Sequence, residues 1–311
     1  MAKFLDAQTI IVHALEEYGG NQKHTADHTM VCCPFHSDRS PSCGIFLGEG
    51  LEIPLGMFHC FGCGEKGHWN RFAQQANLPQ IKSWERFNSV AAYKDVEDEI
   101  ENIDELTKSI RAQYTHWPNT MQWRGYEGKL IKKVGGLLLN DVKSNNIMLL
   151  FPISVNGKLR GGIKAYIEKP AFGLSYISTQ GSWVKKYGLF PYEHVKSMMK
   201  THDALALVEG PRDALRLVSN GIPALAVLGA QNFGKEKALI VSGLFPERVY
   251  AIPDNDEAGA IFGNNVKKYM SRYCDAYNIS LGKGDKKVDP DNANQKIIDR
   301  IKRIIVPDDD V

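Results

Sequence analysis

The chain has 311 residues, of which 43% are hydrophobic and 24% charged, and its formal net charge is +2. These values are typical of a soluble globular protein of about two domains, and no apolar run reaches the ~18 residues of a membrane-spanning helix. Taken by itself, a charge so close to zero argues against nucleic-acid binding, for which a strongly basic domain is usual.

The first predicted element is an amphipathic helix near the N-terminus. Apolar residues recur at helical spacing from Phe4 to Tyr18, and Gly19 ends the pattern. Acidic residues interrupt this segment, so it is not a signal peptide, and we expect a cytoplasmic protein. A second short helix is expected at residues 69–76.

Five of the six cysteines lie within residues 32–63. Clustered cysteines in a chain without a signal peptide favour a metal site over a set of disulfides. A C-x2-H pair and a C-x2-C pair, joined by a spacer long enough to fold back, are the pattern of a tetrahedral zinc site. The four side chains with this spacing are Cys33, His36, Cys60 and Cys63.

Other residues in the cluster bear on which donors bind the zinc. Gly62 and Gly64 permit a tight turn around the second pair. Cys32 and Cys43 are further donors close by, and either is an alternative ligand. We choose Cys33 because it alone forms the C-x2-H pair. Ordinary buried cysteines beside a surface histidine are a weaker interpretation, because two such spacings and a glycine turn rarely coincide by chance.

A polar and acidic segment follows at residues 80–115, and it includes the run from Asp95 to Glu101. This composition is typical of a tether between domains, which is the interpretation we prefer. A solvated helix is the alternative.

Residues 116–200 are basic, with 13 Lys or Arg against 4 Asp or Glu, a net charge of +9. The near-neutral total is therefore an average over regions of different charge, and this region suits nucleic-acid binding. Short apolar runs alternate here with turn signals, and Asn156-Gly157 is a strong hairpin signal. We expect a mixed α+β subdomain with hairpins.

Residues 204–282 alternate between predicted strands and predicted helices. The expected strands are residues 204–208, 223–228, 248–253 and 276–281. The expected helices between them are residues 211–220, 235–242 and 257–273. Alternation of this kind predicts a parallel α/β sheet.

Acidic residues follow three of these strands, namely Glu209, then Asp254 and Asp256, then Asp289 and Asp291. Because the carboxyl ends of parallel strands meet at one edge of a sheet, we expect these side chains to converge. Carboxylates gathered without matching bases attract divalent cations, and magnesium prefers a few carboxylates with water and substrate phosphates. The alternatives are a helix-terminal acid for Glu209, and turn or cap residues for the aspartates.

Together these motifs resemble those of the bacterial and phage, DnaG-like DNA primases. The C-P-F-H and C-F-G-C-G segments resemble their Cys-His-Cys-Cys zinc-binding domain. Residues 209–213, 254–256 and 287–291 resemble the Toprim signature that primases share with topoisomerases, and residues 156–164 and 185–189 resemble the basic subdomain of the polymerase core. The resemblance covers about residues 25 to 295.

The resemblance implies a multidomain α+β and α/β architecture. Its expected parts are a zinc-ribbon-like domain (1–79), the acidic linker (80–115), the basic mixed α+β subdomain (116–200), a Toprim parallel α/β sheet (201–295) and a short C-terminal tail (296–311). It implies a DNA-directed RNA polymerase that makes short RNA primers from ribonucleoside triphosphates on single-stranded DNA. A replicative helicase is the expected partner, and no membrane is expected.

The resemblance also implies roles for particular residues. The expected catalytic and magnesium- or manganese-binding residues are Glu209, Asp254, Asp256 and Asp289, with Asp291 extending the metal site. One structural zinc is expected per chain. The residues expected to contact nucleotide or template phosphates are Arg160, Lys164, Lys185 and Lys186, and which of the last two has the main role is open.

Two other functions remain as alternatives: a Toprim-family nuclease and a non-catalytic zinc-finger DNA-binding protein. Only 20 residues follow Asp291, which is too few for the helicase-binding domain of a bacterial primase. We therefore expect a primase of a phage or a mobile element, acting in the host cytoplasm.

Overall fold

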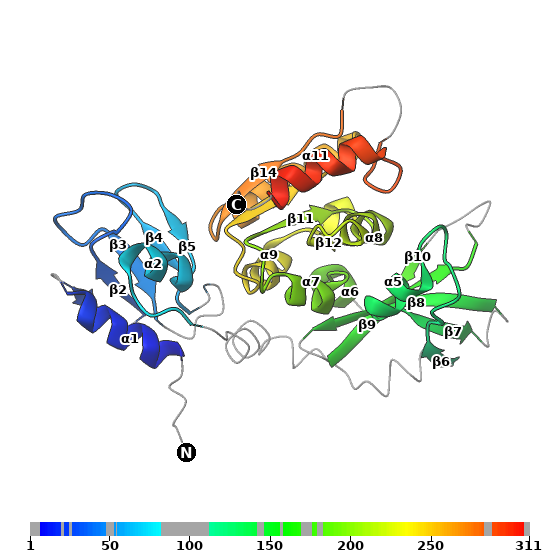
Figure 1. Ribbon diagram of the computed structural model, residues 1–311, viewed down its shortest axis with the longest axis horizontal. Helices are drawn as coiled ribbons and strands as arrows, with labels where there is room; N and C mark the ends of the chain where they lie inside the picture. The colour runs from blue at the N-terminus through cyan, green and yellow to red at the C-terminus, as the bar shows by residue number, and fades with distance from the viewer. Residues whose placement is uncertain are drawn as a thin grey trace, which may run out of the picture. The chain divides into compact units, whose positions relative to one another are not determined.

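The computed structural model describes residues 7–19, 22–24, 27–47, 53, 55–81, 112–141, 146–155, 158–168, 176–178, 183–282 and 288–307. The chain forms two compact units (Figure 1). The first contains residues 1–98, 239–247 and 272–275, and the second contains residues 99–238, 248–271 and 276–311. The five-part division expected from the sequence is finer than this and stays a prediction. No helix in the described ranges has the length and apolar character needed to cross a membrane.

The N-terminal part of the first unit is a small antiparallel sheet between two helices. Its elements are α1 (Ala7–Tyr18), β1 (Lys23–His24), β2 (His28–Val31), β3 (Cys43–Phe46), β4 (Phe58–Cys60), β5 (Lys66–Gly67) and α2 (Trp69–Ala76). The strands follow one another in the order β1-β2-β3-β4-β5. Both predicted helices are confirmed, although Phe4 lies outside the described residues.

One face of this sheet forms the core of the zinc-binding region. Val31, Ile45 and Phe58 alternate with more exposed neighbours along their strands and pack in one cluster with residues of both helices. Within that cluster Trp69 and Phe72 stack, with 5.8 Å between ring centroids. The core thus holds in place the strand ends from which the predicted zinc ligands come.

The second unit begins with a five-stranded antiparallel sheet. Its strands are β6 (Ala112–His116), β7 (Leu137–Asp141), β8 (Asn146–Val155), β9 (Lys158–Tyr166) and β10 (Tyr176–Ser178), in the order β10-β9-β8-β7-β6, with α5 (Gly128–Lys133) between β6 and β7. Strands β8 and β9 pair antiparallel from Met148 with Tyr166 to Val155 with Lys158, as the hairpin prediction requires. The turn residues Asn156 and Gly157 lie outside the described ranges.

Strand β6 corrects the predicted extent of the acidic tether. The prediction ran to residue 115, but Ala112–His116 pair with β7 along the whole of Leu137–Asp141. β6 is the edge strand, where Tyr114, Thr115 and His116 are exposed, so its polar composition does not prevent pairing. The other tether residues, 82–111, lie outside the described residues.

A four-stranded sheet with helices between its strands lies mainly in the second unit; residues 239–242 and 275 of its elements belong to the first. Its elements are β11 (Ala204–Val208), α8 (Pro211–Ser219), β12 (Ala224–Ala226), the 3-10 helix η1 (Ala230–Asn232), α9 (Lys235–Ser242), β13 (Arg248–Ala251), α10 (Glu257–Met270) and β14 (Asp275–Asn278). The strand order is β12-β11-β13-β14, and β11 pairs parallel with both β12 and β13. The predicted fold class, a zinc-ribbon-like region, a mixed α+β region and a parallel α/β sheet, is confirmed.

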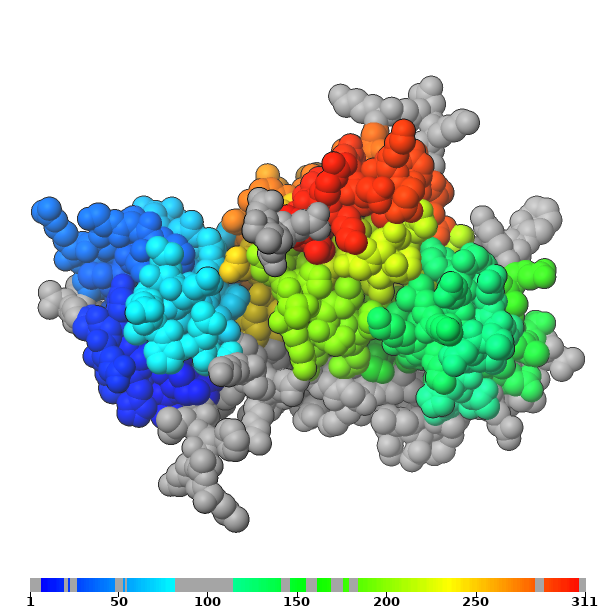
Figure 2. All heavy atoms as spheres, viewed as in Figure 1, coloured from blue at the N-terminus to red at the C-terminus, as the bar shows by residue number. Residues whose placement is uncertain are grey.

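A further helix, α11 (Gln295–Ile305), stands where the sequence interpretation expected only a short tail. Ile298, Ile301 and Ile305 are buried at helical spacing, and α11 packs on β11. The side chain of Asn294 caps its first turn by accepting a hydrogen bond from the backbone of Ile297. The outer, charged face of α11 lies at the molecular surface, coloured red in Figure 2. The prediction of a tail is wrong because these three isoleucines form the buried face of an amphipathic helix.

Within the second unit, the segment between the two sheets contacts both. It contains α6 (Trp183–Tyr187) and α7 (Tyr192–Met198), and α7 packs on β8 and on β12. Phe190 and Ala226 exchange two backbone hydrogen bonds. The ring of Phe190 also lies 4.7 Å from that of Phe151 on β8, measured between centroids. The antiparallel and parallel sheets therefore share a continuous apolar contact.

Candidate functional site

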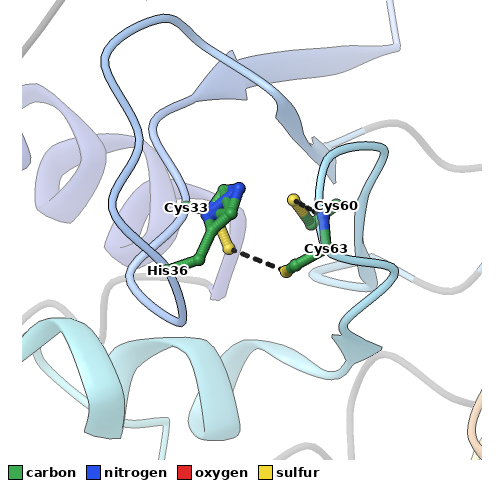
Figure 3. Close-up of side chains that lie close together, drawn as sticks. All are labelled: Cys33, His36, Cys60 and Cys63. Atoms are coloured by element: carbon green, nitrogen blue, oxygen red, sulfur yellow. Dashed lines mark hydrogen bonds between the residues drawn. The ribbon is translucent and has the colours of Figure 1, made fainter.

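The C-x2-H and C-x2-C pairs come together in the first unit. The ligand atoms of Cys33, His36, Cys60 and Cys63 all lie within 4.8 Å of one another (Figure 3). The sulfurs of Cys33 and Cys63 are 3.8 Å apart. A regular tetrahedron of Zn–S bonds of about 2.3 Å has an edge of about 3.8 Å, so this separation fits zinc.

Hydrogen bonds to Asp38 link the two ligand pairs. The backbone N–H of Cys33 donates to Asp38 Oδ2 (2.9 Å), and the hydroxyl of Ser42 donates to the same oxygen (2.6 Å). Ser42 Oγ lies 3.4 Å from the sulfur of Cys60. Asp38 and Ser42 therefore orient a ligand from each pair, which is the usual task of groups just outside a metal's ligands.

The histidine of the cluster occupies space that a glycine leaves open. A Cβ atom built on Gly62 would lie 2.8 Å from His36 Nε2, so only glycine lets the imidazole approach. His36 Nδ1 is buried and has no hydrogen-bond partner among the described residues. A half-buried imidazole beside three thiols fits a zinc ion, which would satisfy one ring nitrogen. Gly64, with φ +80°, supplies the left-handed turn that follows.

The environments of the thiols differ. Burial raises the pKa of Cys33 to about 12. Burial also acts on Cys60, but its hydrogen bonding with Ser42 and with the backbone N–H groups of Cys63 and Gly62 outweighs it and lowers the pKa of Cys60 to about 7. Zinc binding would therefore displace a proton from Cys33 and meet a Cys60 that is already partly thiolate at neutral pH.

The two alternative cysteine donors lie outside this four-membered group. Cys43 is fully buried in β3, and burial raises the pKa of its thiol. Cys32 is half-buried, and its backbone oxygen accepts a hydrogen bond from the hydroxyl of Tyr18 (3.2 Å). The geometry therefore supports the choice of Cys33 as the ligand from the first pair.

In the second unit, two predicted acids meet at the carboxyl edge of the parallel sheet. Glu209 follows β11 and Asp254 follows β13, which is parallel to β11 and next to it. The backbone N–H of Asp254 donates to Glu209 Oε1 at 3.2 Å. The convergence expected from the strand order is therefore present for this pair.

Asp213, on the first turn of α8, joins these acids although the sequence interpretation did not select it. Its side chain accepts from the backbone of Gly210 (3.1 Å) and of Asp291 (3.2 Å). Burial, followed by the charges of Asp289 and Asp254, raises the pKa of Asp213 to about 8. The signal in the sequence was its place three residues after Gly210 at a helix start, where a carboxylate completes a capping box.

Asp256 and Asp289 have roles in the loops around the edge. Asp256 is the N-cap of α10, and its Oδ1 accepts from the backbone of Gly259 (2.9 Å), as the capping alternative expected. Asp289 Oδ1 accepts from the backbone of Asn292 (2.9 Å). The backbone of Val288 donates to Asn255 Oδ1 (3.0 Å), which joins the loops that carry the two aspartates.

The backbone of α10 approaches the Asp254 loop closely. A Cβ atom built on Gly259 would lie 2.1 Å from the carbonyl oxygen of Asp254. Because a contact this short is impossible for a real side chain, glycine at this position allows the helix to lie against the loop.

Asp291 is paired more tightly than the other predicted acids. Its Oδ2 lies 2.6 Å from Arg212 Nη2, and its Oδ1 accepts a hydrogen bond from the hydroxyl of Tyr126. Neither Arg212 nor Tyr126 was selected from the sequence, because their distance along the chain from Asp291 hides the contact.

The predicted basic residues lie on β9 and α6. Lys164 is on β9, opposite Leu150 and Ile177 of the neighbouring strands, and Arg160 is on the same strand with its side chain outside the described residues. Lys185 is exposed on α6. Lys186 Nζ lies 4.0 Å from Glu236 Oε1 and 4.9 Å from the ring centroid of Tyr187.

The Cys-His group and the acids at the sheet edge differ in how closely their donor atoms approach one another. Within the described residues, the Cys-His group is the one whose donor atoms lie as close together as metal ligands do. The acids at the sheet edge fit magnesium by their chemistry, since carboxylates are its preferred protein ligands. Burial is the main cause of the raised pKa of Asp213, and the charges of Asp289 and Asp254 add to it; a divalent cation would relieve that second contribution.

Comparisons with known proteins agree with both parts of the chain. Residues 1–105 match the CHC2 zinc finger family. The DNA primase of Thermotoga maritima is 25% identical over 336 aligned positions, which cover 92% of this chain and 57% of the relative. The DNA primase of Aquifex aeolicus is 23% identical over 328 positions, which cover 90% of this chain and 63% of the relative.

Superposition on the crystal structure of the zinc-binding and RNA polymerase domains of Aquifex aeolicus primase gives a TM-score of 0.43 at 22% identity, covering 95% of this chain and 82% of that one. The chain thus spans somewhat more than half the length of these two curated relatives. The chain is thus similar in sequence to bacterial DNA primases over most of its length, and its first 105 residues match the CHC2 zinc finger family.

Proposed function

We propose that this chain is a DNA primase, a template-directed RNA polymerase that starts short RNA primers on single-stranded DNA. The observation that carries the proposal is similarity to bacterial DNA primases over 92% of the chain. The hydrogen-bonded pair of Glu209 and Asp254 at neighbouring strand ends adds support, because it offers a place for chemistry that a DNA-binding zinc finger does not need.

Magnesium or manganese would be held by Glu209, Asp254 and Asp289, with Asp256 beside them. The chemistry that such ions supply is neutralisation of phosphate charge and activation of the attacking 3′-hydroxyl. Glu209 accepts the backbone N–H of Asp254 and so fixes the direction of that loop. Asn255 fixes the loop of Asp289 in the same way through Val288. These contacts pre-position the carboxylates before a nucleotide arrives.

The basic subdomain would hold phosphates of the nucleotide and the template. The net charge of +9 over residues 116–200 supports this role. Arg160 and Lys164 lie on β9, while Lys185 and Lys186 lie on α6. Lys185 is exposed and Lys186 has Glu236 nearby, so we assign the principal phosphate contact to Lys185.

The zinc-binding region would contact the template through the face of its sheet opposite the core. Met30, Gly44, His59 and Lys66 are paired in register across β2 to β5. Phe61, between two zinc ligands, is 73% exposed, and its ring centroid lies 4.8 Å from that of His59. An exposed aromatic ring on a rigid turn is a platform on which a base of single-stranded DNA can stack.

The remaining parts of the proposal concern partners and place. Ribonucleoside triphosphates would be the substrates and a short RNA the product, with a replicative helicase as partner in the cytoplasm. Origin from a phage or a mobile element belongs to the same proposal and would be tested by the genes that surround the coding sequence.

The decisive test is primer synthesis by the full chain with single-stranded DNA, ribonucleotides and magnesium, over templates that contain every trinucleotide. Wild-type protein should yield short RNA, and Asp254→Ala should yield none while its circular dichroism spectrum stays unchanged. Asp203→Ala, at the opposite end of β11, is the matched control and should retain synthesis. No RNA from any template, even with the cognate helicase present, would refute the proposal.

The same reactions separate the alternatives. Cleavage of DNA with magnesium alone would indicate a Toprim-family nuclease. Template binding that is unchanged by Asp254→Ala, without synthesis or cleavage, would indicate a non-catalytic DNA-binding protein.

A further inference from the structure

Both carboxylate oxygens of Asp291, at the carboxyl edge of the parallel sheet, have side-chain partners. Oδ2 lies 2.6 Å from Arg212 Nη2. Oδ1 accepts the hydroxyl proton of Tyr126. The side chain is only 16% exposed, so these partners meet it away from bulk water. A charge-assisted hydrogen bond of this kind is among the strongest that a protein makes.

The backbone around Asp291 is tied into the same arrangement. Its N–H donates to Asp213 Oδ1 at 3.2 Å. The hydroxyl of Tyr126 lies 3.0 Å from the carbonyl oxygen of Arg212. One phenol thus touches both members of the ion pair, and it comes from a segment 165 residues from Asp291.

Tyr126 is itself rigidly held. Its backbone N–H and C=O exchange hydrogen bonds with Trp123, at 2.9 and 3.0 Å. The ring of Trp123 packs against Phe151 of the antiparallel sheet, with 5.2 Å between centroids. Contacts through Tyr126 and Trp123 therefore fix Asp291 to the antiparallel sheet, and its contact with Asp213 fixes it to the parallel sheet. Both sheets belong to the second unit.

We propose that Arg212 takes the place of a metal ion at Asp291, so that Asp291 is a positioning residue of the acidic edge and not a magnesium ligand. The inference rests on the proposed function in one respect, namely that a divalent cation binds at Glu209, Asp254 and Asp289. A cation bound to Asp291 as well would have to sit against the guanidinium, and the repulsion between like charges at that distance is large in a partly buried site. Magnesium also demands near-ideal octahedral geometry, which a carboxylate held on both oxygens cannot adjust to supply.

The arrangement leaves one carboxylate charge of the edge paired by a fixed cation. Burial, followed by the charges of Asp289 and Asp254, raises the pKa of Asp213 at the same edge. Arg212 neutralises Asp291, and the Tyr126–Asp291–Arg212 contact also holds the loop that precedes α11.

The experiment measures binding of Mn²⁺ to the full chain, with zinc bound, by the loss of the free-ion signal in electron paramagnetic resonance. Asp254→Asn should weaken the binding at the sheet edge by at least about tenfold, because it removes a ligand. Asp291→Asn should change it by less than about threefold, the effect of one nearby charge. Asp203→Asn, which breaks the exposed ion pair with Arg248 (2.7 Å), is the control for loss of a charge elsewhere.

The same measurement on variants of Arg212 tests the other member of the ion pair. Arg212→Met should expose Asp291 to the solvent cation and tighten Mn²⁺ binding, and the double change with Asp291→Asn should return it to the wild-type value. Arg216→Met, on the same helix, is the matched control for loss of one positive charge. The inference is overturned if Asp291→Asn weakens binding as much as Asp254→Asn, or if Arg212→Met and Arg216→Met have the same effect.

Hydrogen exchange at residues 288–293 reports the positioning role directly. Tyr126→Phe should speed exchange of the Asp291 amide while Mn²⁺ affinity changes by less than about threefold, and Arg212→Lys should restore part of the protection lost in Arg212→Met. Unchanged exchange in Tyr126→Phe would overturn the role. None of these measurements uses primer synthesis. A failed synthesis assay would therefore refute the proposed function, while Mn²⁺ binding and hydrogen exchange would still decide whether this inference holds.

Discussion

The Cys-His group and the acidic edge both bring together side chains of the types that bind cations, but the chain assembles the two groups by different means. The zinc donors come from two short turns, and nearby backbone groups such as the N–H of Gly62 hold the sulfurs. At the acidic edge Glu209 and Asp254 are 45 residues apart, and Tyr126 and Asp291 are 165 apart. One site is formed by local turns and the other by the fold of a whole sheet.

This difference has an energetic counterpart. The small N-terminal region has one compact core, so the bound ion should supply much of its stability. The second unit has two sheets and a large apolar core, so it should fold without an ion. Four predictions test this contrast, in order of decreasing effect.

Loss of zinc should have the largest effect. Chelation, or Cys60→Ser, should unfold residues 27–81, because a structural zinc contributes on the order of 10 kcal/mol in small zinc-binding domains. The second unit should remain folded. Two-dimensional NMR of the full chain would show this as loss of dispersed signals from the first region alone. Cys32→Ser, outside the four-membered group, is the control. Loss of dispersed signals from both units would contradict the prediction that only the N-terminal region depends on zinc for its fold.

Lys237 tests whether the second unit tolerates a buried charge through its core alone. It is fully buried, its ammonium donates to the carbonyl of Val227, and burial lowers its pKa to about 7. The unfolded chain, with a lysine pKa near 10.4, binds more protons between pH 7 and 10, so the free energy of unfolding should rise with pH in that range. Lys237→Met should remove the rise and stabilise the protein at pH 7 by on the order of 3 kcal/mol.

Urea unfolding at pH 7 and 9.5, followed by fluorescence of the second unit, measures this effect. Lys235→Met, exposed on the same helix, should leave the pH dependence in place. Parallel curves for wild type and Lys237→Met would contradict the prediction.

Phe61 tests the zinc-binding region as a contact for DNA. Phe61→Ala should weaken binding of single-stranded oligonucleotides by about 1–2 kcal/mol, the usual value for one stacked base, without releasing zinc. Fluorescence anisotropy, with zinc measured in the same samples, would check it. Tyr114→Ala, which removes another exposed ring, on β6, is the control. An equal loss of oligonucleotide affinity in both variants would contradict the proposal that a base stacks on Phe61.

The smallest effect concerns α11. Asn294→Ala removes the side-chain acceptor at the start of the helix and should cost about 1 kcal/mol of stability in the second unit alone. Thermal unfolding monitored separately in the two units would detect it. Asn264→Ala, exposed in the middle of α10, is the comparison for a change of the same side chain at a position that caps nothing. A shift in the first unit would contradict the separation of the two.

The sequence was most informative where a feature is local. The helix at residues 69–76 and the strand at 204–208 were predicted with the bounds that the structure has, because periodicity and turn residues mark them. The spacing of Cys33, His36, Cys60 and Cys63 likewise depends on turn geometry. The parallel sheet followed from the alternation of strands and helices, and the meeting of Glu209 with Asp254 followed from the sheet.

What the sequence did not provide depends on long-range contacts or on weak patterns. Asp213 becomes important only because Asp289 and Asp254 fold against it. Arg212 and Tyr126 could not be assigned to Asp291 without the packing of the two sheets. The strand β6 is polar because it lies at an edge, and its pairing with β7 is invisible in its composition.

Gly259, an uncharged residue, affects the position of the Asp254 loop at the acidic edge. Since a methyl group there would stand 2.1 Å from the Asp254 carbonyl oxygen, even alanine must push the loop and its carboxylate away from Glu209. The spacing of the two acids is thus set by the absence of a side chain on the next helix. Variation at position 259 would therefore change the spacing of Glu209 and Asp254 without replacing either acid.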